Sequence, residues 1–286
     1  MGFLVALLSA ACSTAKDIVS KSLASKVHAD VSTFASFLFA IPFYLVVMVV
    51  ASLFGVETLS YTGSFFALVL ARSITDVFAE GFKMKAFAAG DISLVTSFMC
   101  LSPLILALIS PFITGDKVTT HDFIALGFIV AGSLLLVRRD KTTGKVIQLK
   151  ALVYAFLASV AFALNSCFDR LAVVNSGALL SGFAMTFMAG VFCLPIFLRH
   201  RGAPMQLQTF AKPFLWRGGW ETLFMVSKLF ALTLLEAHVV LGITRISLFF
   251  SVIAGRVMFG EQDTKRRLFG AICMYAGLAV LLWHHL

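Results

Sequence analysis

The sequence has few charged residues. Lys, Arg, Asp and Glu make up 13% of its 286 residues, against roughly 25% in a soluble globular protein. Apolar residues reach 60% and the mean hydropathy is +0.97. This balance excludes a soluble enzyme, a coiled coil and a disordered regulator. The long unbroken apolar runs also exclude a transmembrane β-barrel, whose strands alternate apolar and polar residues. The composition therefore predicts an all-α polytopic membrane protein.

Motifs that mark soluble activities are also missing. The net charge is +9, but no aromatic stacking motif lies between the basic clusters, so we expect basic loops beside a bilayer and no nucleic-acid partner. The chain shows no HExxH motif, no GxSxG motif and no paired-carboxylate motif placed in a loop. We therefore predict that the protein is not an enzyme.

Cysteine and histidine give no sign of a metal centre. Each cysteine lies inside an apolar run and none forms a CxxC pair, so we expect free buried thiols. The histidines lie near the ends of apolar segments and show no metal-ligand spacing with cysteine or carboxylates. We predict no metal site and no cofactor. The residues concerned are Cys12, Cys100, Cys167, Cys193 and Cys273, and His28, His121, His200, His238, His284 and His285.

Ten segments are apolar enough to be candidate membrane spans, each of which needs about 20 residues. The first begins without a basic stretch, which indicates a membrane helix and not a cleaved signal peptide. The connections are short and leave no room for a soluble domain. The predicted spans are 3–24, 31–54, 64–88, 92–113, 122–137, 150–169, 176–198, 211–235, 237–259 and 268–284.

The chain repeats itself at an offset of 145 residues. We predict a first five-helix repeat at 1–140, a basic linker at 141–147 and a second repeat at 148–286. An odd number of spans in each half makes the second half enter the membrane from the opposite side, which is typical of transporters that bind substrate near the midplane. The matching positions are Arg72 with Arg217, Asp76 with Glu221, Lys83 with Lys228, Asp91 with Glu236, Ser102 with Ser247, Gly115-Asp116 with Gly260-Glu261, and Gly132 with Gly277.

Loop charges predict the orientation. The loop at 55–63 contains no Lys or Arg, whereas its counterpart at 199–212 contains three and the linker at 138–150 contains five. The loop at 265–267 is entirely basic. Because basic loops remain in the cytoplasm, both termini are predicted to be non-cytoplasmic. We expect an integral protein of a bacterial cytoplasmic membrane.

Four stretches resemble the drug/metabolite transporter superfamily, EamA type. AFAAGDISLVTSFMCLSPLILALISPFITGDK (86–117) and RISLFFSVIAGRVMFGEQDTKRRLFGAICMYAGLAVLL (245–282) resemble two copies of its fourth-helix signature. LLSAACSTAKDIVSKSLASK (7–26) and LASVAFALNSCFDRLAV (157–173) resemble the starts of its two repeats. The resemblance implies ten transmembrane helices in two inverted five-helix repeats around a central cavity, with alternating-access transport or export of small metabolites. The chain departs from the family in having Asp116 where Glu is usual and in its predicted outside termini.

Ionisable residues inside the third span share one helix face. Arg72, Asp76, Glu80 and Lys83 fall within about 80° of arc. Charges at the bilayer centre are costly, so they face a cavity or a partner. One interpretation is a charged lining of the substrate path, and the other is mutual neutralisation of Arg and Asp at i, i+4.

The other spans carry further candidates. The eighth span repeats the pattern, although its Arg217 also fits a place at the membrane surface. Lys16 either lines the cavity, pairs with Asp17 or reaches the interface, and Asn165, the counterpart of Lys16, either lines the cavity or bonds between helices. Arg245 is suited to an anionic group. The predicted substrate-binding residues are Lys16, Arg72, Asn165, Arg245, Lys83 and Lys228, and the predicted proton-coupling or ion-pairing residues are Asp76, Glu80, Glu221, Asp17 and Asp169.

Two functions follow from this pattern. The first is secondary transport, without ATP, of a small polar metabolite that is anionic or zwitterionic. A buried carboxylate would carry a coupling proton, because burial disfavours its charged form. The second is a flippase that holds the headgroup of a phospholipid or lipid-linked phosphate in a basic cavity. The expected partners are the small-molecule or lipid substrate and the bilayer, and a monomer and a homodimer both stay open.

Overall fold

The computed structural model describes residues 1–55, 62–90, 95, 98–99, 101–135, 145–247, 250 and several positions between 269 and 283, and helices joined by turns and short loops make up this part of the chain. No strand occurs among these residues, so the predicted all-α fold is confirmed. The helices are α1 (Gly2–Ala24), α2 (Ala29–Leu38), α3 (Ile41–Leu53), α4 (Phe65–Ala89), α6 (Ser102–Ile113), α7 (Thr120–Leu135), α8 (Lys145–Ser176), α9 (Ala178–Leu198), α10 (Ala203–Thr209), α11 (Ala211–Leu234) and α12 (Ala237–Thr244).

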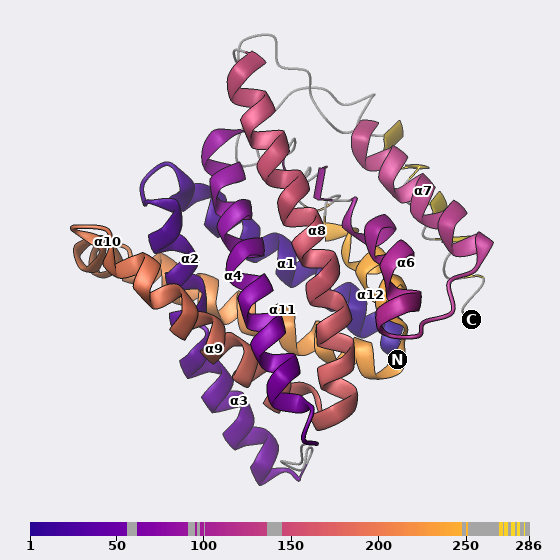
Figure 1. Ribbon diagram of the computed structural model, residues 1–286, viewed down its shortest axis with the longest axis horizontal. Coiled ribbons are helices and arrows are strands. Elements are labelled where there is room, and N and C mark those ends of the chain that lie inside the picture. The colour runs from indigo at the N-terminus through magenta and orange to yellow at the C-terminus, as the bar shows by residue number, and fades with distance from the viewer. Residues whose placement is uncertain are drawn as a thin grey trace.

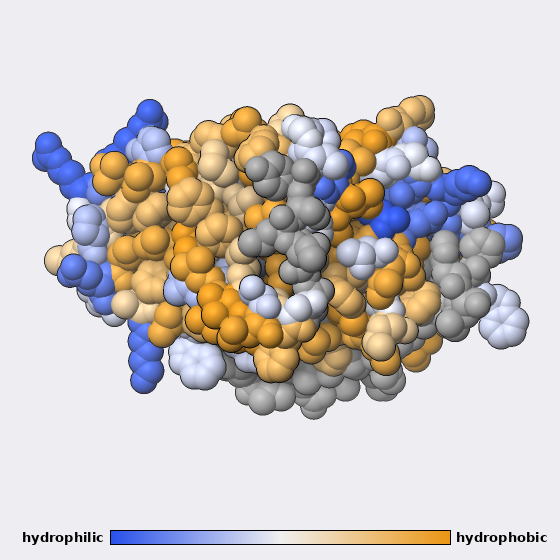
Figure 2. All heavy atoms as spheres, turned by 90° about the horizontal axis from the view of Figure 1, so that it is seen from below, coloured by the Kyte–Doolittle hydropathy of each residue, from blue (hydrophilic) through white to orange (hydrophobic). Residues whose placement is uncertain are grey.

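Four described segments are long and apolar enough to cross a bilayer by themselves, namely Gly2–Ala24, Ala29–Leu53, Leu149–Ser176 and Ala178–Leu198. Helices α4 and α11 have 25 and 24 residues, which is also long enough to cross a bilayer. They are less apolar than these four segments because they carry the charged faces described below. Large apolar side chains such as Phe78 and Trp216 lie on the outside of the bundle. Figure 2 shows apolar atoms over most of one face, with hydrophilic side chains toward its ends. This surface is suited to lipid.

A proline divides the second predicted span into α2 and α3. Pro42 has no backbone N–H and its ring clashes with the preceding turn, so a continuous helix is broken just before it. The hydroxyl of Thr222 in α11 donates to the carbonyl of Ala40 at 3.2 Å, which helps to satisfy the backbone at the break. The break also brings the carbonyl of Phe39 against Gly218, where an added Cβ would lie 2.2 Å from that oxygen. Glycine at 218 therefore allows α11 to approach the backbone of the first half.

The most extensive helix contacts each join a helix of one half to a helix of the other half. Helix α4 of the first half packs along α8 of the second, and α11 of the second half packs along α1 of the first. Helices α4 and α8 run side by side in Figure 1. Since α4 corresponds to α11 and α1 to α8, these two pairs are equivalent under the repeat. The charged faces of α4 and α11 meet the other half in the same way.

Several predicted spans are described only in part. Helix α6 lies in the predicted span at 92–113 and α12 in the span at 237–259, and only a few further residues of either span are described. The predicted linker at 141–147 and the loop at 265–267 lie largely or wholly outside the described residues. The described helices nevertheless enclose the region where the charged faces converge.

Candidate functional site

The charged face of α4 is buried in the bundle. Arg72, Asp76, Glu80 and Lys83 are between 1% and 7% exposed. Their i, i+4, i+8 and i+11 spacing keeps them on one side of the helix, while apolar residues such as Phe78 face outward. A buried charge is stable only with charged or hydrogen-bonding partners, so the contacts of this face define the site.

One group of ion pairs joins α1, α4 and α11. The Lys16 ammonium donates to Glu221 at 2.8 Å, and the Lys83 ammonium donates to Glu80 at 2.6 Å. Arg217 bridges the two acids, with Nη2 lying 3.2 Å from a Glu80 oxygen and 3.8 Å from a Glu221 oxygen. Lys83 also lies 3.5 Å from Asp17. The group therefore ties both halves together through their charged faces.

A second group joins α4, α8 and α11 around Asp169, whose side chain is fully buried. Asp169 accepts from Arg72 Nε at 2.8 Å and from Lys228 Nζ at 2.7 Å. Arg72 also pairs with Asp76 on its own helix. The amide of Asn165 donates to Asp76 at 2.9 Å. Here again a carboxylate from one half holds a cation of the other.

The two groups are related by the repeat. The offset of 145 residues relates α4 to α11, and setting Lys21 against Arg170 relates α1 to α8. Under this alignment three contacts have equivalents, since an inverted repeat presents the same side chains to each other twice. The equivalent contacts are Lys16–Glu221 with Asn165–Asp76, Arg217–Ser20 with Arg72–Asp169, and Lys83–Asp17 with Lys228–Ser166.

The two groups differ where an acid replaces a neutral residue. Glu80 corresponds to Met225, and Met225 Sδ lies 4.0 Å from Arg72 Nη2 as Glu80 lies beside Arg217. Asp169 likewise corresponds to Ser20, which accepts from Arg217 Nε at 2.6 Å. The positions are therefore equivalent while the charges are not. This asymmetry gives each end of the site its own electrostatic character.

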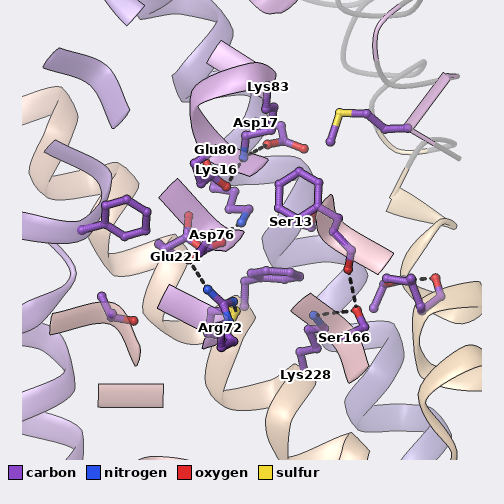
Figure 3. Close-up of a pocket in the computed structure, with 18 of the residues that line it drawn as sticks. Ser13, Lys16, Asp17, Arg72, Asp76, Glu80, Lys83, Ser166, Glu221 and Lys228 are labelled. Atoms are coloured by element: carbon purple, nitrogen blue, oxygen red, sulfur yellow. Dashed lines mark hydrogen bonds and ion pairs between the residues drawn. The ribbon is translucent and has the colours of Figure 1, made fainter. Parts of the chain in front are cut away.

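A narrow cavity of about 60 Å³ lies between these groups, and Figure 3 shows the charged side chains around it. It is lined by most of the predicted site residues, together with apolar side chains such as Phe224, over whose ring the Lys16 ammonium lies at 3.8 Å. Asn165 and Asp169 are not among the lining residues, and they hold Asp76 and Arg72 from behind. The charged lining residues are Lys16, Asp17, Arg72, Asp76, Glu80, Lys83, Glu221, Lys228 and Arg245.

Arg245 enters the cavity from the end of α12. Its Nη2 donates to the hydroxyl of Ser102 at 2.5 Å, so it connects α12 to α6. These two helices belong to opposite halves, as do the pairs around Glu80 and Asp169. The predicted anion-binding residue therefore lies at the same junction between the halves.

The geometry also bears on the alternatives that the sequence left open. Arg217 is fully buried in the bundle and contacts Glu80, so its guanidinium faces a partner on another helix and not the solvent. Lys16 pairs with Glu221 and not with its neighbour Asp17. The i, i+4 pairs Arg72–Asp76 and Arg217–Glu221 are both present, but each also has a partner on another helix. Sequence reasoning missed Ser20 as a partner, because a serine in a span carries no distinctive signal.

Comparison with known proteins identifies the family. The sequence profile of the EamA-like transporter family matches residues 1–138 and again residues 149–283. The chain belongs to the EamA-like transporter family. It is therefore a membrane transporter of the drug/metabolite type, and the resemblance seen in the sequence is confirmed. The EamA-like fold, with its internal repeat, is the polytopic helical fold described above.

A solved structure shows the same fold as this EamA-like chain. It is described only as the crystal structure of a protein, has a TM-score of 0.64 and is 13% identical. The alignment covers 99% of this chain and 96% of that one. No curated protein matches the sequence. The likeness to the solved structure concerns the fold alone.

Proposed function

We propose that the protein is a secondary transporter that carries a small anionic or zwitterionic metabolite through the cavity by alternating access. The observation that carries the proposal is the charge of the lining. Among the residues that the structure describes there, five are cationic and four are carboxylates. The cations of this lining can donate charge-assisted hydrogen bonds to a carboxylate or phosphate of the substrate, and its carboxylates can accept hydrogen bonds from a substrate ammonium.

The size of the cavity supports a cycle in which the ion pairs open. A volume of about 60 Å³ holds only a few water molecules, at roughly 10–15 Å³ for each one. A metabolite therefore needs space that the present contacts occupy. A substrate carboxylate or phosphate would take the place of a protein carboxylate on Lys16 or Lys83, while a substrate ammonium would take the place of the cation. Exchange of partners keeps every charge paired as the cavity widens.

The repeat supports alternating access. Equivalent contacts close the site in both groups. A structure in which the first group opens and the second stays closed therefore has a counterpart in which the second opens and the first stays closed. Asp76, Glu80 and Glu221 are the carboxylates through which a coupling proton would act. Neutralising one of them would release its cation toward the substrate, which would link protonation to binding.

A flippase remains the second candidate, because the same cations suit the phosphate of a lipid headgroup. The two candidates differ in what accompanies the anion. A soluble metabolite needs a site closed to lipid, whereas a lipid needs a path for its acyl chains. The experiment below distinguishes them by the substrate that moves.

Transport by the purified protein in proteoliposomes tests the proposal. We expect uptake or exchange of soluble monovalent anions or zwitterions above empty liposomes, and less of cations of similar size. Lys16→Gln should reduce this transport at least tenfold, because it removes a cation that would bind the substrate anion. We expect the variant to fold, because Glu221 keeps Arg217 as a partner. Lys212→Gln removes the same charge from an exposed position of α11 and should leave transport intact. Translocation of a fluorescent phospholipid without movement of any soluble anion would replace the proposal by the flippase.

A further inference from the structure

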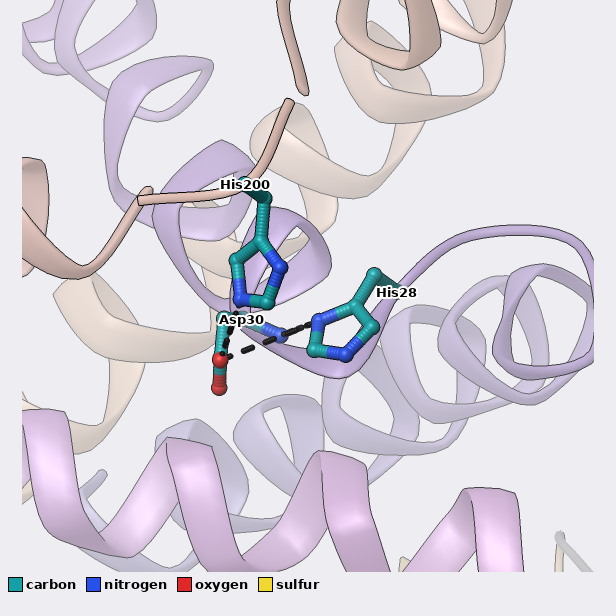
Figure 4. Close-up of side chains that lie close together, drawn as sticks. All are labelled: His28, Asp30 and His200. Carbon is teal, nitrogen blue, oxygen red and sulfur yellow. Dashed lines mark hydrogen bonds and ion pairs between the residues drawn. The ribbon is translucent and has the colours of Figure 1, made fainter. Parts of the chain in front are cut away.

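A second group of ionisable side chains lies away from the cavity, at one end of the bundle. His28 is the N-cap of α2 and Asp30 lies in the first turn of that helix, whereas His200 lies at the turn between α9 and α10. His200 Nε2 lies 2.8 Å from Asp30 Oδ2, and His28 Nδ1 lies 3.7 Å from the same oxygen. Figure 4 shows the two imidazoles converging on this carboxylate, with ring centroids 3.9 Å apart.

These three side chains have the donor set and the spacing of a zinc site. Imidazole nitrogen and carboxylate oxygen are common Zn²⁺ ligands, and catalytic or open sites have three protein ligands and a water molecule. Bonds of about 2.0–2.1 Å in a tetrahedron place neighbouring ligand atoms about 3.4 Å apart. The three ligand atoms here lie within 4.8 Å of one another, and the two distances to Asp30 lie on either side of that value. Small side-chain rotations therefore bring all three to one ion.

The backbone around the group is already held in place. Phe34 of α2 stacks on Phe197 of α9 with centroids 4.4 Å apart, which fixes the two helix ends that carry the ligands. Gln206 of α10 accepts from the backbone N–H of His28 at 3.1 Å. Nδ1 of His28 accepts from the N–H of Asp30 at 3.3 Å, a long hydrogen bond that a small rotation of the imidazole would exchange for the ion. A site whose ligands are already oriented loses little entropy when it binds an ion.

The surrounding charges do not prevent binding. Lys26, Arg199 and Arg201 lie close in sequence to the ligands, but all three are exposed, where water and salt screen them strongly. Asp30 supplies a negative charge directly to the ion. The predicted absence of a metal site rested on spacing in the sequence, and 170 residues separate Asp30 from His200. Folding, and not local sequence, brings them together.

We propose that His28, Asp30 and His200 form a binding site for a divalent transition-metal ion, with Zn²⁺ as the best fit. His28 and Asp30 come from the first half of the chain and His200 from the second. A bound ion therefore ties the two halves together at this end of the bundle. If the halves separate here during the transport cycle, the ion holds this end closed.

Calorimetry with ZnCl₂ and the purified protein tests the binding. We expect one ion per chain, and at least a tenfold loss of affinity in His200→Ala and in Asp30→Asn. His121→Ala removes a histidine from an exposed position of α7 and should bind as the unaltered protein does. The thermal midpoint of each variant without metal shows whether it is folded. Equal Zn²⁺ affinity in the double variant His28→Ala/His200→Ala and the unaltered protein would overturn the site.

Transport tests the tie between the halves, and this part rests on the proposed function. Zn²⁺ should slow exchange by the unaltered protein several-fold and have no effect on His200→Ala. Binding at the site without any effect on exchange would retain the metal site and overturn the tie. Because calorimetry needs no substrate, failure of the metal site is distinguishable from failure of the proposed transport.

Discussion

A single substitution of Asp169 would remove the carboxylate that two cations of the second group share. Asp169 is fully buried and accepts from Arg72 at 2.8 Å and from Lys228 at 2.7 Å. Asp169→Asn keeps the shape of the side chain but removes the charge that both cations share. Breaking a buried ion pair in this way costs about 3–5 kcal/mol, because an uncompensated charge remains. At about 2 °C per kcal/mol for a chain of this size, the thermal midpoint should fall by roughly 6–10 °C.

The second substitution, Lys228→Met, should restore much of this loss. It removes one of the two stranded cations, and Arg72 retains Asp76 on its own helix. Replacing a buried pair by apolar residues is often nearly neutral. The assay is the thermal midpoint of the purified protein in detergent, measured for both single variants and the double variant. We expect the effects to be non-additive by about 0.5–3 kcal/mol, as for residues in direct contact.

The equivalent position in the other half provides the control. Ser20 corresponds to Asp169 and accepts a single hydrogen bond from Arg217. Ser20→Ala should cost only about 1–3 kcal/mol, the penalty of one unsatisfied buried group. An Asp169→Asn variant that loses less stability than Ser20→Ala would refute the reasoning. Strict additivity of Asp169→Asn and Lys228→Met would do so too.

The remaining expectations concern packing and orientation. Gly218→Ala should destabilise the protein by about 1–3 kcal/mol, because its Cβ would overlap the carbonyl of Phe39. Gly219→Ala, whose Cβ would lie 3.4 Å from the ring of Phe43, should cost clearly less in the same thermal assay, and equal losses would contradict the packing. A reporter fused to Leu286 should show the activity expected outside the cytoplasm, and a cytoplasmic signal would overturn the orientation that loop charges predict.

The sequence predicts the helices and the charged faces well, because both depend on local periodicity. The 3.6-residue period places Arg72, Asp76, Glu80 and Lys83 on one side of a helix, and all four are buried. Because charge is costly in a bilayer, these four residues need partners, but this cost does not identify the partners. The repeat goes further, since it relates Lys16 to Asn165 before any contact is known.

The partners themselves depend on tertiary packing. Glu80 lies beside Arg217, which is 137 residues away, and no local pattern indicates that contact. Local sequence also leaves two places for Arg217, because a residue near the start of a span can lie either inside the bundle or at the membrane interface. His28 and His200 belong to turns whose meeting depends on how α2 packs against α9. Periodicity within each segment carries no information about that packing.

Stabilisation by ligands tests the central claim, that the cations lining the cavity bind an anionic group of the substrate. The measurement is the thermal shift of the purified protein with anions, zwitterions, cations and lipid headgroups of similar size. A ligand at 100 times its dissociation constant stabilises by about 2.7 kcal/mol. The account predicts a shift with a soluble anion or zwitterion that is lost in Lys16→Gln and kept in Lys212→Gln. Stronger stabilisation by cations, or an anion shift that survives Lys16→Gln unchanged, would contradict it.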